Sequence, residues 1–101
     1  MTRAAERPEL QRTTIANQSD AIVVGAGVGA RYAGIQITSG AAATTVLIRH
    51  GTLVSDPIAF TYKVDAINTT RLFQMPDPVA MNSGIFCDVD ANTTEAVVLY
   101  Y

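Results

Sequence analysis

Apolar and polar residues alternate along most of the chain with a period of two, which is the pattern of half-buried β-strands. In the segment 32–38, for example, Ile35 and Ile37 fall on one face, and Gln36 and Thr38 fall on the other. Similar segments recur along the chain and end in Gly, Pro, Asn or Asp, which are residues of turns. The segments expected to be strands are 21–24, 32–38, 44–50, 58–64, 70–75, 84–89 and 95–101.

About seven short strands at even spacing, with polar turns and no helical periodicity, predict an all-β domain, either an antiparallel sandwich or a small barrel. Pro76 and Pro78 each lack the backbone N–H that a central strand donates. The segment 75–78 is therefore expected to be an extended loop or part of an edge strand.

Residues 1–20 differ from the rest of the chain, because Leu10 and Ile15 are their only large apolar residues. A frayed terminus and an arm that becomes ordered on a partner's surface both fit this composition. The sequence therefore divides into an N-terminal extended arm, 1–20, and a β-sandwich domain, 21–101. Deletion of residues 1–19 is expected to leave the sandwich folded.

The composition narrows the class of protein. The 101 residues suffice for one domain, only 16% of them are charged, and the net charge is −2. A negative chain is a poor nucleic-acid binder. Residues 1–12 lack the apolar segment of a secretion signal, and no apolar run has the roughly 18 residues of a membrane span, so we expect synthesis in a cytoplasm and no membrane partner.

One motif points to a nucleotide. Gly25, Gly27 and Ala30 follow a β-branched run in the pattern G-x-G-x-x-A of dinucleotide-binding proteins. That site needs a helix after the glycines and an acidic residue about 20 positions later. The segment 31–40 instead alternates like a strand, and positions 45–50 contain no acid. We interpret the glycines as a flexible exit from the first strand, or as the hinge between arm and sandwich, and expect no cofactor.

Asp88, Asp90 and Asn92 have the spacing of the first three ligands of a calcium loop. Thr93 and Leu99 stand where that loop needs Gly and Glu. Asp and Asn at alternate positions are also typical of a turn between strands. The turn is the favoured interpretation, and a surface cation site is the alternative.

Candidate catalytic residues are few. His50 is the only histidine, and it falls at the end of an expected strand. Ser55 or Ser83 could join it in a triad assembled in space, but neither has the glycine pattern of a nucleophile elbow. Cys87 lies among the apolar positions of its strand, and as the only cysteine it cannot form an intrachain disulfide. We expect no catalytic or metal-binding residue and no enzymatic activity.

Three segments carry a resemblance to a known class of protein. Residues 32–44 read Y-x-G-I-x-I-x-S-G-x-A-A-T, residues 84–89 read G-I-x-x-D-V, and residues 97–101 read V-x-L-Y-Y. From about residue 31 to 101 the chain resembles small structural proteins of tailed-bacteriophage virions. The resemblance implies a β-sandwich, often jelly-roll-like, that serves as a capsid decoration (cement) protein, a head fibre, or an accessory protein of the neck or tail.

The expected role is a non-enzymatic decoration protein that binds the major capsid protein on the capsid surface of the virion, as a homo-oligomer and most simply a trimer. A carbohydrate-binding β-sandwich module is the alternative from another class. An arm that clamps onto a partner and an aromatic C-terminal edge would supply the contacts. The residues expected to bind the partner are Arg3, Arg7, Leu10, Arg12, Ile15, Tyr100 and Tyr101.

Overall fold

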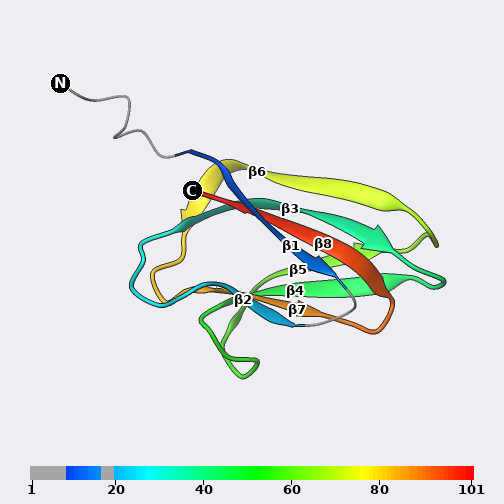
Figure 1. Cartoon of the computed structure of the whole chain (residues 1–101), viewed down its shortest axis with the longest axis horizontal. Coiled ribbons are helices and arrows are strands. Elements are labelled where there is room, and N and C mark those ends of the chain that lie inside the picture. Colours follow the sequence, from blue (N-terminus) through cyan, green and yellow to red (C-terminus); the bar gives the residue numbers. More distant parts are fainter. Residues whose placement is uncertain (1–8, 17–19) are drawn as a thin grey trace.

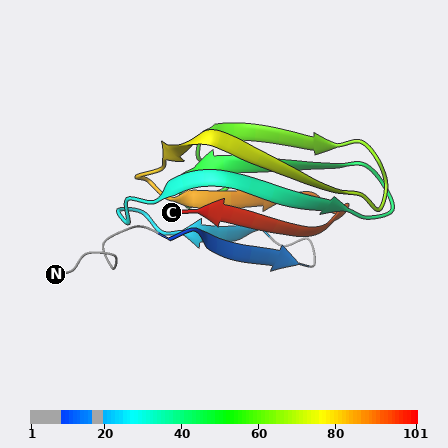
Figure 2. The same cartoon turned by 90° about the horizontal axis from the view of Figure 1, so that it is seen from above.

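The structure is a computed structural model, and it describes residues 9–16 and 20–101 as eight β-strands without a helix among them (Figure 1). The strands are β1 (Gln11–Ala16), β2 (Ala21–Val24), β3 (Arg31–Ser39), β4 (Thr44–His50), β5 (Ile58–Val64), β6 (Thr70–Ala80), β7 (Ile85–Val89) and β8 (Thr93–Tyr100). They form two antiparallel sheets that pack face to face (Figure 2). The predicted all-β sandwich is confirmed, with eight strands in place of about seven.

The strand order is that of a jelly roll. One sheet has the order β1-β8-β3-β6 and the other the order β2-β7-β4-β5. The pairs β4–β5, β3–β6, β2–β7 and β1–β8 therefore arise as if the chain were folded in half at the β4–β5 turn and then rolled up. This connectivity brings the first and last strands together, although nearly the whole sequence lies between them.

The additional strand, β1, corrects the boundary expected between arm and sandwich. Residues 11–16 pair with β8 from Gln11–Tyr100 to Ala16–Glu95. Ile15 is only 5% exposed and belongs to the hydrophobic core. The strand is hard to recognise in the sequence because Ile15 is the only large apolar residue that it contributes. Residues 1–8, with the expected partner-binding residues Arg3 and Arg7, lie outside the described part of the chain.

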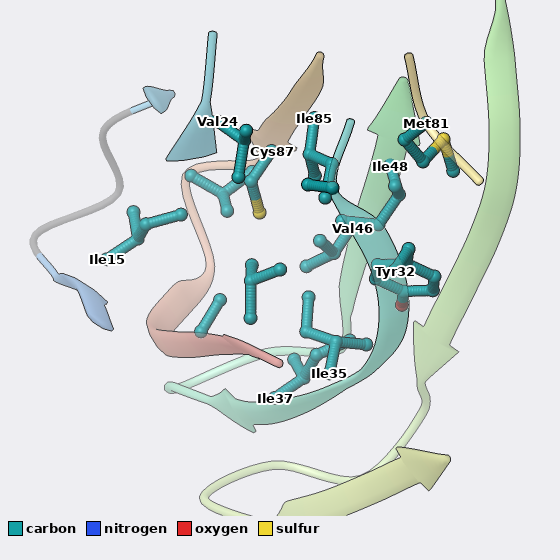
Figure 3. Packing of buried hydrophobic residues seen from close by; sticks show 14 of the residues in the cluster. Ile15, Val24, Tyr32, Ile35, Ile37, Val46, Ile48, Met81, Ile85 and Cys87 are labelled. Atoms are coloured by element: carbon teal, nitrogen blue, oxygen red, sulfur yellow. The ribbon is translucent and has the colours of Figure 1, made fainter. Parts of the chain in front are cut away.

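The core lies between the two sheets and is built from the inward positions of seven strands and the neighbouring loops (Figure 3). Tyr32, Ile35, Ile48 and Ile85 are fully buried in it. Cys87 is also fully buried, and burial raises the pKa of its thiol to about 12, with smaller contributions from Asp20 and Asp88. Cys87 is thus a small core residue, as predicted.

Aromatic side chains pack where edge strands β5 and β6 meet. Tyr32, Phe60, Tyr62 and Phe73 form a row in which neighbouring ring centroids are 5.2, 6.3 and 4.8 Å apart. The Tyr32 hydroxyl donates a hydrogen bond of 2.8 Å to the Tyr62 hydroxyl. Burial raises the pKa of Tyr32 far above its usual value, so this donor stays protonated. The row closes the β5–β6 side of the sandwich.

Pro76 and Pro78 lie in β6, which is an edge strand, and this agrees with the sequence prediction of a loop or edge strand for residues 75–78. Between the pairs Gly34–Gln74 and Tyr32–Val79, β3 advances two residues and β6 five, so Pro76 and Pro78 lie in a bulge outside the regular ladder. Gly34 has φ +151°, and a Cβ there would collide with the Phe73 carbonyl oxygen. Glycine at this position therefore allows β6 to approach β3 closely.

Candidate binding surfaces

The outward side of the sheet β1-β8-β3-β6, which we call the outer face, is the first candidate surface. The register aligns its outward residues in three rows that cross the sheet. The rows are Arg12–Leu99–Gly34–Gln74, Thr14–Val97–Gln36–Leu72, and Glu95–Thr38–Thr70. A jelly roll buries the other side of this sheet in its core, so the outer face is available to a partner.

A shallow hollow of about 420 Å³ lies in the outer face. Its residues come from all four strands and from the residue before β1: Leu10, Arg12, Thr14, Gln36, Leu72, Gln74, Val97 and Leu99. Leu10 and Leu72 are 41% and 53% exposed. Four of the eight residues are aliphatic and one is charged, which suits contact with another protein surface better than it suits chemistry on a small substrate.

Loops at the end of the sandwich where the chain terminates form the second candidate surface (Figure 1). We call the loops 25–30, 51–57 and 81–84 together the loop end. Their bases are joined by hydrogen bonds from Gly27 N to the Asn82 carbonyl, 2.8 Å, and from Gly51 N to the Gly84 carbonyl, 3.1 Å. The apolar side chains of Val28, Leu53 and Val54 are 67%, 59% and 56% exposed there.

The β4–β5 loop is held rigidly from within. The Asp56 carboxylate accepts hydrogen bonds of 2.9 Å from the backbone N–H groups of Thr52 and Leu53. Arg49 Nη1 donates to the Asp56 carbonyl at 2.8 Å, while Arg49 Nη2 pairs with the Asp88 carboxylate at 3.0 Å. These contacts fix the backbone that carries Leu53 and Val54, so the two side chains point into solvent from an ordered loop.

The residues expected to bind a partner are only partly brought together. Leu10 and Arg12 both line the hollow. Ile15 points into the core and is not available on the surface. Tyr100 is half-buried, with its hydroxyl 3.2 Å from the Thr13 hydroxyl, whereas Tyr101 is 37% exposed at the end of the chain.

Sequence reasoning missed several residues of these surfaces. Leu72 and Glu95 lie on the outer face with Arg12 only because β1, β8, β3 and β6 are neighbours in the fold. Leu53 and Val54 had a recognisable signal, since they are two aliphatic residues inside a segment with the Ser-Asp-Pro composition of a turn. An apolar pair at the tip of such a turn has no core to enter.

The glycine motif leads into a strand, as predicted. β3 begins at Arg31, one residue after the motif ends, and Gly27 and Gly29 have φ values of +79° and +78°. Gly27 donates to the Asn82 carbonyl, so the segment is a defined turn that carries the chain from one sheet to the other.

The predicted turn is confirmed at residues 90–92, which connect β7 to β8, and protein groups bond to the carboxylates of Asp88 and Asp90. Asp88 pairs with Arg49. Asp90 accepts hydrogen bonds from the Thr44 hydroxyl at 2.6 Å, and from the backbone N–H groups of Thr45 and Asn92 at 2.8 Å each. Burial alone would raise the pKa of Asp90, but these hydrogen bonds outweigh it and hold the pKa below its usual value. The described residues contain no group of three or more potential metal ligands.

His50 is the last residue of β4, and its Nε2 accepts a hydrogen bond of 3.3 Å from the backbone N–H of Ser83. It therefore helps to join the β4–β5 and β6–β7 loops. The described part of the chain also contains no helix that is long and apolar enough to cross a membrane.

In comparisons with known proteins, no family model, curated protein or solved structure matches this chain. What the protein does is therefore inferred from its fold and its two candidate surfaces.

Proposed function

We propose that the chain is a non-enzymatic structural protein of a tailed-phage virion, and specifically a capsid decoration protein that binds the major capsid protein on the head. The observation that carries the proposal is the loop end, where an internally bonded loop displays Leu53 and Val54 to solvent. Exposed aliphatic side chains on a rigid backbone can enter a crevice of a partner at little entropic cost. The jelly-roll fold, which viral capsid domains share, supports the same role.

The position of the aromatic residues favours this role over carbohydrate binding. Six of the seven aromatic side chains are buried or half-buried, and Tyr101 is the exposed one. A sugar-binding face usually offers aromatic rings to solvent, whereas Phe60, Tyr62 and Phe73 pack against the core here. A neck, tail or head-fibre position remains the alternative within the virion.

Binding to phage heads tests the proposal. Heads that lack the chain are incubated with the purified protein and sedimented, and the bound copies are counted by quantitative mass spectrometry. Replacement of Leu53 and Val54 by Ser should reduce head binding at least about tenfold, because the apolar tips supply the contact. The matched control is Ile67→Ser, since Ile67 is 58% exposed in the β5–β6 loop at the other end of the sandwich.

Wild-type protein that does not sediment with heads would contradict the proposal. Equal binding by the Ser variant and the wild type would exclude the loop end as the attachment surface. Copies found on purified tails, in place of heads, would favour the accessory role.

A further inference from the structure

Two opposite charges lie on either side of the middle row of the outer face. Within its three rows the charged side chains are Arg12 in the first row and Glu95 in the third, and both are exposed. Val97 and Leu99 lie on β8 on the same face. Glu95 precedes Leu99 by four residues on β8, and Leu99 pairs with Arg12. About 13 Å of strand therefore separate the two charged positions.

We propose that the outer face binds the outer face of a second copy of this chain about a twofold axis. The axis lies in the plane between the two apposed outer faces and runs along the middle row, over the pair Thr14 and Val97 that is midway between the two charges. The first row of one copy then faces the third row of the other. Arg12 lies opposite the partner subunit's Glu95, and by symmetry this contact occurs twice.

A second copy suits this face because the surface is complementary to itself. In a twofold dimer each patch meets the same patch of the partner, so a positive and a negative group must lie on either side of the axis. Arg12 and Glu95 meet that requirement, and the hollow's Val97 and Leu72 lie in the middle row, along the axis. Burial of Leu72 and Val97 along the axis supplies the affinity, whereas the ion pairs on either side of it determine the register and exclude other partners.

This assignment has consequences for assembly. A trimer, the state expected from the sequence, requires two different surfaces in each contact, whereas this face makes a pair. The loop end lies on another part of the molecule, so head binding and pairing can fail independently of each other. Because the first row is the one nearest the loop end and faces the third row of the other copy, the two loop ends lie at opposite ends of the dimer.

Charge reversal tests the pairing. The variants are Arg12→Glu, Glu95→Arg and the double variant that carries both changes. Lys63→Glu is the control, because Lys63 is exposed on β5 in the other sheet. Sedimentation equilibrium over a concentration series gives the mass and the dissociation constant of each. Circular dichroism verifies that each exposed substitution leaves the fold intact.

Each single reversal places like charges opposite each other and should raise the dissociation constant about tenfold or more. The double variant should pair like the wild type, because its ion pairs are restored with opposite polarity. An equimolar mixture of the two single variants should form heterodimers. The Arg12→Glu variant has two acidic groups at these positions and the Glu95→Arg variant has two basic groups, so unlike charges meet in both contacts of the heterodimer. Native mass spectrometry of the mixture, with one variant isotope-labelled, detects them.

A wild-type chain that remains a single copy at all concentrations overturns the proposal, and so does a mass of three copies. A dimer that tolerates both single reversals assigns the contact to another surface. Single variants that weaken pairing without rescue in the double variant also overturn it, because the loss then has no relation to Arg12–Glu95 contacts.

Discussion

The side chain of Asp56 occupies the space beside Gly51 into which any other residue at position 51 would place its Cβ. From there the Asp56 carboxylate reaches the N–H groups of Thr52 and Leu53. Because Gly51 has no side chain, it leaves the space from which Asp56 holds the loop that carries Leu53 and Val54. The relationship connects a buried glycine to the surface that we propose for attachment.

Gly51→Ala should displace Asp56 and break its hydrogen bonds to the loop. We expect a loss of about 1–3 kcal/mol in the free energy of unfolding, the usual cost of overpacking, measured by urea denaturation. Gly25→Ala is the matched control, because a Cβ at Gly25 would have no atom within 4 Å. Equal stability of the two variants would show that Asp56 can move without cost.

The hydroxyl pair of Tyr32 and Tyr62 allows a second test of stability. Tyr62→Phe removes the hydroxyl that accepts the hydrogen bond of Tyr32, a side chain with 0% exposure. The Tyr32 hydroxyl is then left buried without its acceptor, so we expect a loss of about 1–3 kcal/mol in the free energy of unfolding. Tyr32→Phe should cost less, because the half-buried Tyr62 hydroxyl can turn to water. If the hydrogen bond matters, the double variant will lose less stability than the sum of the two single losses.

Much of this fold is readable from the sequence. The segments 44–50 and 58–64 were expected as strands and coincide with β4 and β5. Their alternation gives a strong periodic signal, with Val46 and Ile48 facing the core from β4, and Phe60, Tyr62 and Val64 facing it from β5. β1 gives a weak periodic signal, because Ile15 is its only large core residue and most of its other residues are polar.

The candidate surfaces were less accessible to sequence reasoning. Arg12 and Glu95 lie near opposite ends of the chain, and only the closure of β1 onto β8 places them on one face. No local pattern reports which strands are neighbours or in what register they pair. The hollow in the outer face has the same origin, since its residues come from separate strands that are far apart in the sequence.

The position of β1 reverses the expectation for an N-terminal deletion. Removal of residues 1–19 deletes Ile15 from the core and uncovers the backbone edge of β8. We expect it to destabilise the domain by more than the roughly 2–5 kcal/mol of one large core truncation. Ile15→Ala separates the side-chain part of this loss, and deletion of residues 1–8, which keeps β1, is the control. A 1–19 deletion that melts like the wild type would restore the original boundary at residue 20.

Asp90 should make stability depend on pH in the acid range. Its hydrogen bonds hold its pKa in the folded protein below the ordinary value of 3.8, so the folded state binds this proton less readily than the unfolded chain does. The resulting stabilisation is complete above pH 3.8 and is lost as the pH falls through the lower, folded-state pKa. Asp90→Asn should therefore be less stable than the wild type at pH 7, and the difference should shrink in acid.

Urea denaturation of wild type and Asp90→Asn between about pH 7 and pH 2 measures this difference, with Asp65→Asn, at an exposed position after β5, as the control. The amide that Asp90→Asn introduces keeps one oxygen acceptor, but its NH₂ group cannot accept from Thr45 N as the second carboxylate oxygen does. A stability gap that stays constant across the whole pH range would mean that the Asp90 charge contributes nothing. The loss would then lie in the shape of the turn.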